Sequence, residues 1–136
     1  MGHEPVIVLD THVLVWWLGS AALLSAKARK VIAKESERNA IVVSAISVLE
    51  VVTAVRRGRL QFTVPVETWL SDAHKLPELR FEPVTAHIAQ LAGNFGDDMP
   101  GDPADRIIAA TSIALSAPLV TADARLRSSR ALATVW

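Results

Sequence analysis

A short apolar run that ends in a carboxylate constrains the fold of this chain more than any other feature. Val6 to Leu9 are four apolar residues in a row, and Asp10 follows them. Aliphatic, largely β-branched residues of this kind predict a short buried strand. The pattern returns near the C-terminus, where Pro118 to Ala122 precede Asp123. Because ligands of open α/β sheets lie at the carboxyl ends of the strands, the two runs predict two carboxylates at one edge of a sheet.

Strand-like and helix-like segments alternate along the whole chain. Strands are expected at residues 6–9, 40–43, 79–84, 118–121 and 133–136, and helices at 13–18, 25–38, 45–57, 66–76, 85–91, 102–116 and in a short segment from 123. The expected helix caps are Ser25, Ser44, Thr85 and Asp102 at N-termini and Gly58 after a C-terminus. The alternation predicts an α/β fold, a parallel sheet wrapped by helices on both faces.

Composition limits the classes of function. With 136 residues and 51% hydrophobic content, one globular domain over 1–136 is expected. The lack of cysteine excludes disulfides, thiolate zinc sites and cysteine nucleophiles. Fourteen acidic and fourteen basic residues balance, so a polyanion must be held by a local patch or a bound cation. The N-terminal apolar run contains Asp10 and is too short to span a bilayer, so a soluble, cytoplasmic protein without signal peptide or membrane segment is expected.

Asp10 and Asp123 each have two interpretations. Asp is a favoured helix N-cap, and the end of a parallel strand is a favoured place for a ligand-binding acid. Thr121 lies two residues before Asp123, on the same strand face. From its position alone, each of the two acids can be either a helix cap or a site residue.

Glu50 lies in the most apolar helical segment of the chain. Ser47, Thr53 and Arg57 stand at helical spacing from it and form one polar stripe with it. The stripe either faces solvent, with Arg57 as the partner of Glu50, or lines a cleft.

Asp102 and Asp105 both belong to a helix start. Asp102 before Pro103 is a typical N-cap, and Asp105 at the third helical position is favoured by the helix dipole. Since Asp102 already supplies a cap, Asp105 is the better site candidate. Asp97 and Asp98 lie in a glycine-containing loop and are expected to be solvated.

Taken together, the acids indicate a shared site, because an α/β topology can direct several of them to one edge of the sheet. Two carboxylates about 4 Å apart repel by roughly 4 kcal/mol at an effective dielectric constant of about 20. Such a group either has raised pKa values or holds a cation. All-oxygen ligands suit Mg²⁺ or Mn²⁺, and such an ion in an acidic cleft activates water against a phosphodiester.

Four blocks in this order resemble a known family over essentially the whole chain. They are Val-Leu-Asp-Thr-His, Ser-Val-Leu-Glu-Val, Gly-Asp-Pro-Ala-Asp-Arg and Leu-Val-Thr-Ala-Asp. The chain is similar to PIN domains, and more narrowly to the VapC-type toxins of bacterial toxin–antitoxin pairs. The resemblance implies a three-layer α/β/α PIN-like fold with a short parallel sheet. It also implies an Mg²⁺- or Mn²⁺-dependent endoribonuclease, with RNA as substrate, a VapB-like antitoxin as partner and a homodimer as assembly.

The resemblance assigns the family's four acids, in order, to Asp10, Glu50, Asp105 and Asp123. Asp102 matches an accessory acid, while Thr11 and Thr121 stand where hydroxyl residues support the acids. This chain departs from the family pattern in the third block. Close relatives often carry His or Arg and then a Phe there, whereas Gly101 and Ala104 leave more space beside Asp105.

The mechanism implied is hydrolysis of RNA by a metal-activated water. Asp10, Asp105 and Asp123 would bind the ion directly or through water, and Glu50 would complete its shell or orient the attacking water. Candidates for the RNA backbone, or else ordinary surface charges, are Arg106, Arg125 and Arg127.

Histidine and tryptophan residues are less decisive. His12 is interpreted as structural, since His3, His74 and His87 provide no ligand spacing. Because Trp16 and Trp17 are adjacent, either one of them meets a second subunit or an antitoxin peptide, or both rings pack between neighbouring helices.

Two other classes of function remain as alternatives. A phosphatase or phosphotransferase would use Asp10 as nucleophile, but a haloacid-dehalogenase-like enzyme requires an Asp where His12 stands, and the paired acids of a receiver domain are missing. A non-catalytic binding module would keep the PIN fold and use the acidic cleft as a scaffold.

Overall fold

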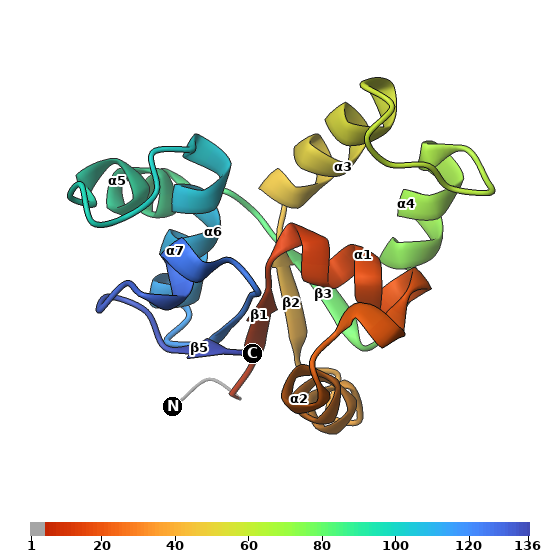
Figure 1. The fold of residues 1–136 in the computed structure, drawn as a ribbon, viewed down its shortest axis with the longest axis horizontal. Coiled ribbons are helices and arrows are strands. Elements are labelled where there is room, and N and C mark those ends of the chain that lie inside the picture. The colour runs from red at the N-terminus through yellow and green to blue at the C-terminus, as the bar shows by residue number, and fades with distance from the viewer. Residues whose placement is uncertain (1–4) are drawn as a thin grey trace.

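A five-stranded parallel sheet forms the centre of the protein, in the strand order β3-β2-β1-β4-β5 (Figure 1). The computed structural model describes residues 5–136. In chain order the strands are β1 (Ile7–Leu9), β2 (Ile41–Ser44), β3 (Leu79–Glu82), β4 (Leu119–Val120) and β5 (Thr134–Val135). The chain builds outward from β1 first through β2 and β3 and then, on the other side, through β4 and β5. The strand order therefore reverses between β1 and β4, which is where open parallel sheets bind ligands.

Helices cover both faces of the sheet, which confirms the predicted α/β architecture. They are α1 (Thr11–Gly19), a 3₁₀ turn η1 (Ala21–Leu23), α2 (Ala26–Ser36), α3 (Ile46–Arg56), α4 (Val66–His74), α5 (Ala86–Asn94), α6 (Pro103–Ala114) and α7 (Ala124–Arg127). Among the described residues, no helix has the length and apolar character needed to cross a bilayer.

Side-chain alternation along the strands divides the core into two layers. Ile7 and Leu9 point to the face covered by α1, α2 and α4, where they pack with Ile41. Val8 points to the opposite face and packs against α6 and α7, together with Val42. The register pairs Val8 with Val42, so each face of the sheet is continuous across neighbouring strands.

The predicted caps explain where most helices begin and end, except that Ser44 is the last residue of β2 and Ala45, without a side-chain hydrogen bond, precedes α3. Ser25 and Thr85 accept hydrogen bonds from the backbone of the first turns of α2 and α5. Gly58 has φ = 73°, the left-handed conformation predicted for the residue that closes α3. Ser116 also has a positive φ, 51°, so α6 ends two residues before the predicted boundary.

Helix α3 is placed differently from the helices that cover the faces. It follows β2 directly at the carboxyl end of the strand and contacts α1, α4 and α6. Helix α2 lies at the opposite end of the sheet (Figure 1). The carboxyl edge of the sheet is therefore framed by the start of α1, by α3 and by the start of α6.

Candidate active site and metal centre

Asp10 lies at the end of β1 and is buried, with 7% of its surface exposed. Its Oδ1 accepts a hydrogen bond from the Thr11 backbone N–H at 2.8 Å, and its Oδ2 accepts one from the Thr121 hydroxyl at 2.7 Å. Burial raises the pKa of Asp10 even though both hydrogen bonds act against the rise. Asp10 therefore caps α1, as one interpretation expects, and it also lines the cleft described below, so the two interpretations do not exclude each other.

A chain of hydroxyl groups holds Glu50 toward the start of α1. Thr11 donates to Oε1 of Glu50 at 2.5 Å, and its oxygen lies 2.7 Å from that of the buried Ser47. A hydroxyl has one hydrogen, so Thr11 donates to Glu50 and accepts from Ser47. Among the described residues of the polar stripe predicted on this helix, Ser47 is buried, Glu50 reaches the cleft described below, and Arg57 is exposed without an ion pair to Glu50. Burial, followed by repulsion from Asp10 and Asp102, raises the pKa of Glu50.

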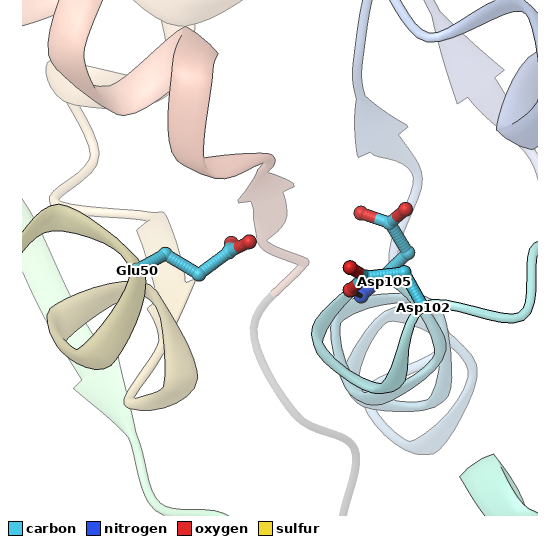
Figure 2. A group of neighbouring side chains, drawn as sticks. All are labelled: Glu50, Asp102 and Asp105. Atoms are coloured by element: carbon cyan, nitrogen blue, oxygen red, sulfur yellow. Dashed lines mark hydrogen bonds between the residues drawn. The ribbon is translucent and has the colours of Figure 1, made fainter. Parts of the chain in front are cut away.

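Asp102 and Asp105 approach Glu50 from the opposite side. Asp102 caps α6 as predicted, since its Oδ1 accepts the Asp105 backbone N–H at 3.1 Å. Figure 2 shows the Glu50 side chain extending from α3 toward the two aspartates at the start of α6. One carboxylate oxygen of each residue lies within 4.8 Å of the other two, close enough to share one cation.

Asp123 completes the acidic group from the end of β4. It caps α7 by accepting the Arg125 backbone N–H at 2.8 Å. Its own backbone N–H donates to the Thr121 hydroxyl at 3.0 Å, and that hydroxyl donates to Asp10. Thr121 is fully buried and therefore connects the acids at the ends of β1 and β4.

All four predicted acids line one cleft of 420 Å³ at the reversal point of the sheet. Its lining is Asp10, His12, Trp16, Glu50, Asp105, Ala122 and Asp123. Burial raises the pKa of Asp105 to about 7, and repulsion from Asp10, Asp102, Glu50 and Asp123 adds to the effect. Several carboxylates that converge with this much unbalanced negative charge fit a hard divalent cation.

The predicted arginines differ in their surroundings. Arg106 donates through three of its nitrogens to the carbonyls of Ala92, Phe95 and Pro100, and its guanidinium lies 5.7 Å from the Phe95 ring centroid. It ties the end of α5 and the following loop to α6, so it is not the ordinary surface charge of the second interpretation, and its role on the RNA backbone stays a prediction. Arg125 lies 3.9 Å from both Asp105 and Asp123 and is mainly exposed.

Two aromatic residues of the cleft were not predicted as such. His12, interpreted as structural, is exposed and lines the cleft (His3 lies outside the described residues). Trp16 lies between His12 and Trp136, with ring centroids 5.8 Å away from its own on both sides. Trp17 packs against the core, so both rings of the adjacent pair pack within the chain. For His12, the available signal was its position two residues after the candidate acid Asp10.

Comparisons with known proteins agree with this geometry. Ribonuclease VapC22 of Mycobacterium tuberculosis is 37% identical over 132 residues, which cover 96% of this chain and 98% of that protein. The VapBC2 structure from Rickettsia felis, bound to a DNA fragment from its promoter, superposes with a TM-score of 0.67 at 17% identity, covering 95% of this chain and 96% of that one.

Two further solved structures share the fold. A toxin–antitoxin complex from Klebsiella pneumoniae has a TM-score of 0.61 at 17% identity, covering 94% of this chain and 96% of that one. FitAcB from Neisseria gonorrhoeae has a TM-score of 0.67 at 21% identity, covering 95% and 96%. The sequence model of the PIN domain family matches residues 7–131, which include all the acids of the cleft. This chain therefore belongs to the PIN domain family.

Proposed function

We propose that this protein is a metal-dependent endoribonuclease and the toxin of a type II toxin–antitoxin pair. The observation that supports this most is the convergence of Asp10, Glu50, Asp105 and Asp123, from four separate segments, on one cleft. The similarity to a ribonuclease over nearly the whole chain supports the same activity. Family membership gives no support to a phosphatase that uses Asp10 as nucleophile.

We propose Asp10, Glu50, Asp105 and Asp123 as the residues that hold Mg²⁺ or Mn²⁺. A bound ion of this kind lowers the pKa of water and offsets the charge of a phosphodiester. The hydrogen bonds to Asp10 engage one lone pair on each oxygen, so each oxygen keeps a second one for a ligand. Asp102 caps α6 through one oxygen and adds its charge to the group.

Glu50 is proposed to hold the ion through the attacking water, which it would orient and deprotonate. Its carboxylate is held by Thr11 and faces Asp102 and Asp105 across the cleft (Figure 2). The hydrogen bond from Thr11 fixes the direction of this carboxylate, which positions its oxygens to accept a proton from a water in the cleft. Glu50 would take the proton of the water as its oxygen attacks phosphorus; the opposite P–O bond would break, and the leaving oxygen would keep the electron pair and take up a proton from solvent.

The expected protein partner follows from the structural neighbours. They include toxin–antitoxin complexes, so we expect a VapB-like antitoxin. We also propose RNA as the substrate, a homodimer as the assembly and the cytoplasm as the location.

The proposed activity is tested by incubating the purified chain with total RNA in the presence of Mg²⁺, Mn²⁺ or EDTA. We expect cleavage with a divalent ion and none with EDTA. Asp10→Asn should abolish cleavage with the fold intact by circular dichroism, whereas Asp97→Asn, in an exposed loop outside the cleft, should cleave normally. Cleavage by the Asp10→Asn variant would contradict the proposal.

A non-catalytic binding module would give a different result. Calorimetric titration with Mn²⁺ would then show an ion bound by the wild type and lost in Asp105→Ala, while the wild type cleaves no RNA under any of these conditions.

A further inference from the structure

A second groove continues from the acidic cleft along α3. It has a volume of 540 Å³, in the range of small-molecule and cofactor sites, and it shares His12, Trp16 and Glu50 with the acidic cleft. Its remaining lining comes from α1, from α3, from the segment after α3 and from Asp102. The two hollows therefore form one continuous surface that begins at the acids.

The chemistry of the lining changes along this groove. The acids Glu50 and Asp102 mark its junction with the cleft, and apolar side chains including Val15, Leu49 and Leu60 follow. Arg57 and Arg59, both exposed, contribute two positive charges. Arg57 stands seven residues after Glu50, which corresponds to about 10 Å along a helix axis. The groove thus combines an acidic end, an apolar and aromatic middle and a basic end.

Trp16 is held in a defined orientation in the middle of this surface. Its ring is inclined by 46° to that of His12 and by 49° to that of Trp136, at centroid separations of 5.8 Å in both cases. Trp136 and the core beneath α1 support the indole, while His12 is exposed. An ordered, partly exposed aromatic pair is a stacking surface for a base, since every base has a π-face.

We propose that this groove binds the nucleotides of single-stranded RNA next to the phosphodiester that is cut. A base stacks on Trp16 and His12, and the phosphates beyond it bind Arg57 and Arg59. A nucleotide offers an aromatic base and an anionic phosphate, which match the aromatic middle and the basic end of the groove, and the arginines bind phosphate without a metal ion. The inference rests on the proposed ribonuclease function and deepens it, because it assigns the residues that bind the substrate beside the phosphodiester that is cut.

Binding is measured in an Asp105→Asn background, which separates it from cleavage. The probe is a single-stranded RNA of twelve nucleotides with randomised sequence, and the measurements are fluorescence anisotropy and tryptophan quenching. We expect Trp16→Leu to weaken binding by roughly 5- to 150-fold and to remove most of the quenching. The double variant Arg57→Ala/Arg59→Ala should flatten the slope of log affinity against log salt by about 1.4, or about 0.7 for each lost phosphate contact.

Matched controls separate the groove from general effects. Trp17→Leu removes the neighbouring indole, which packs in the core, and should leave affinity unchanged. Arg29→Ala/Lys30→Ala removes two exposed charges from α2, which borders neither hollow, and should leave the salt slope unchanged. If Trp16→Leu does not fold, Trp16→Phe keeps a smaller ring and is expected to retain partial quenching. An abasic version of the probe, which has no base to stack, should bind the parent and the Trp16 variants equally.

The outcomes distinguish this inference from the proposed function. If the wild type cleaves RNA but the groove variants bind as tightly as the parent, the inference is overturned and the nuclease assignment stands. If the variants lose self-association in sedimentation and not RNA affinity, the groove is an interface between copies, which also overturns it. If the variants lose RNA affinity while the wild type cleaves nothing with any metal, the groove assignment stands and the proposed reaction fails.

Discussion

The two sides of the acidic cleft hold their carboxylates in different ways. On the strand side, Asp10 is buried and both its oxygens accept hydrogen bonds, one of them from the buried Thr121. On the helix side, Asp105 is half-buried and its pKa is raised to about 7 by burial and by the surrounding acids. On the strand side, the hydrogen bonds of Thr121 between the ends of β1 and β4 fix the position of the Asp10 carboxylate. On the helix side, the start of α6 brings in negative charge that only a cation or a proton offsets.

The largest effect is expected from Asp105→Asn. Removing this carboxylate should lower the rate of RNA cleavage by more than about 100-fold, beyond the range seen when a residue that only supports a ligand is lost. The same change removes a charge repelled by four other acids, so the metal-free protein should become more stable. Single-turnover cleavage and thermal unfolding in EDTA measure the two effects.

Asp102→Asn serves as the control for that variant. Asparagine is as good an N-cap as aspartate, so the start of α6 is kept and only an exposed charge is lost. A smaller loss of cleavage is expected than for Asp105→Asn. A metal-free Asp105→Asn protein that melts below the wild type would show that repulsion does not dominate on the helix side.

Thr121→Val tests the strand side and should change stability in the opposite direction. The substitution removes the donor to Asp10 and the acceptor for the Asp123 backbone N–H. Hydrogen bonds to charged groups stabilise by roughly 1.5–3 kcal/mol, so the metal-free protein should lose about that much. Metal affinity or cleavage should fall by roughly 10- to 100-fold.

Calorimetry with Mn²⁺ and denaturant unfolding measure the Thr121 effects. Thr121→Ser keeps the hydroxyl and should recover most of both losses. Equal losses in Thr121→Ser and Thr121→Val would mean that the threonine acts through packing of its methyl group, and the comparison between hydrogen-bonded and repelled acids would no longer hold.

The stability of the metal-free protein should depend on pH through Asp105, on the helix side of the cleft. Its pKa in the folded state, about 7, exceeds the ordinary value of 3.8, so the folded protein binds a proton that the unfolded chain has released. The stability of the metal-free protein should therefore fall as pH rises from about 4 to about 7. Metal binding displaces that proton, so affinity should rise over the same interval, by at most about tenfold per pH unit for one proton.

Unfolding in EDTA and Mn²⁺ titrations at several pH values measure this dependence. Asp105→Asn should flatten the curve of stability against pH near pH 7. It should leave the part of the pH dependence that is due to Asp10 and Glu50, whose pKa values are also raised. A stability that rises with pH through this interval would contradict the assignment of the raised pKa to Asp105.

Much of the fold and the membership of the cleft were predictable because their signals are local. The apolar runs before Asp10 and Asp123 formed the predicted strands β1 and β4, and Asp102 capped α6. Parallel strands that end in acids bring those acids to one edge whatever the details of packing. The side-chain contacts of Glu50 were not predictable, because Thr11 lies 39 residues away and the contact depends on how α1 and α3 cross.

The arginines and aromatic residues show the same limit. Arg106 was expected either at the RNA backbone, because arginine suits phosphate geometry, or as a surface charge. Its guanidinium binds the carbonyls of Ala92 in α5 and of Phe95 and Pro100 in the following loop, whose path has no local signal. Trp136, the last residue of the chain, contacts Trp16 only because β5 pairs with β4 beside β1. Contacts between distant segments required the structure.

The smallest effect is expected from Arg125→Ala, which tests whether a side chain already offsets the charge on the helix side. The guanidinium lies 3.9 Å from both Asp105 and Asp123, and 68% of its side chain is exposed, so solvent screens both pairs. Surface ion pairs contribute about 0–1 kcal/mol. The metal-free protein should therefore lose at most about 1 kcal/mol of stability. A cation that competes with Arg125 should bind slightly more tightly, by a factor of up to about five.

Calorimetry with Mn²⁺ at low ionic strength measures this change, and Arg127→Ala, on the same short helix and exposed, is the control. Weaker Mn²⁺ binding in Arg125→Ala would mean that the arginine organises Asp105 and Asp123 for the ion and does not compete with it. The helix side of the cleft would then be preorganised by an ion pair, as the strand side is by Thr121, and the two sides would differ only in the kind of group that holds them.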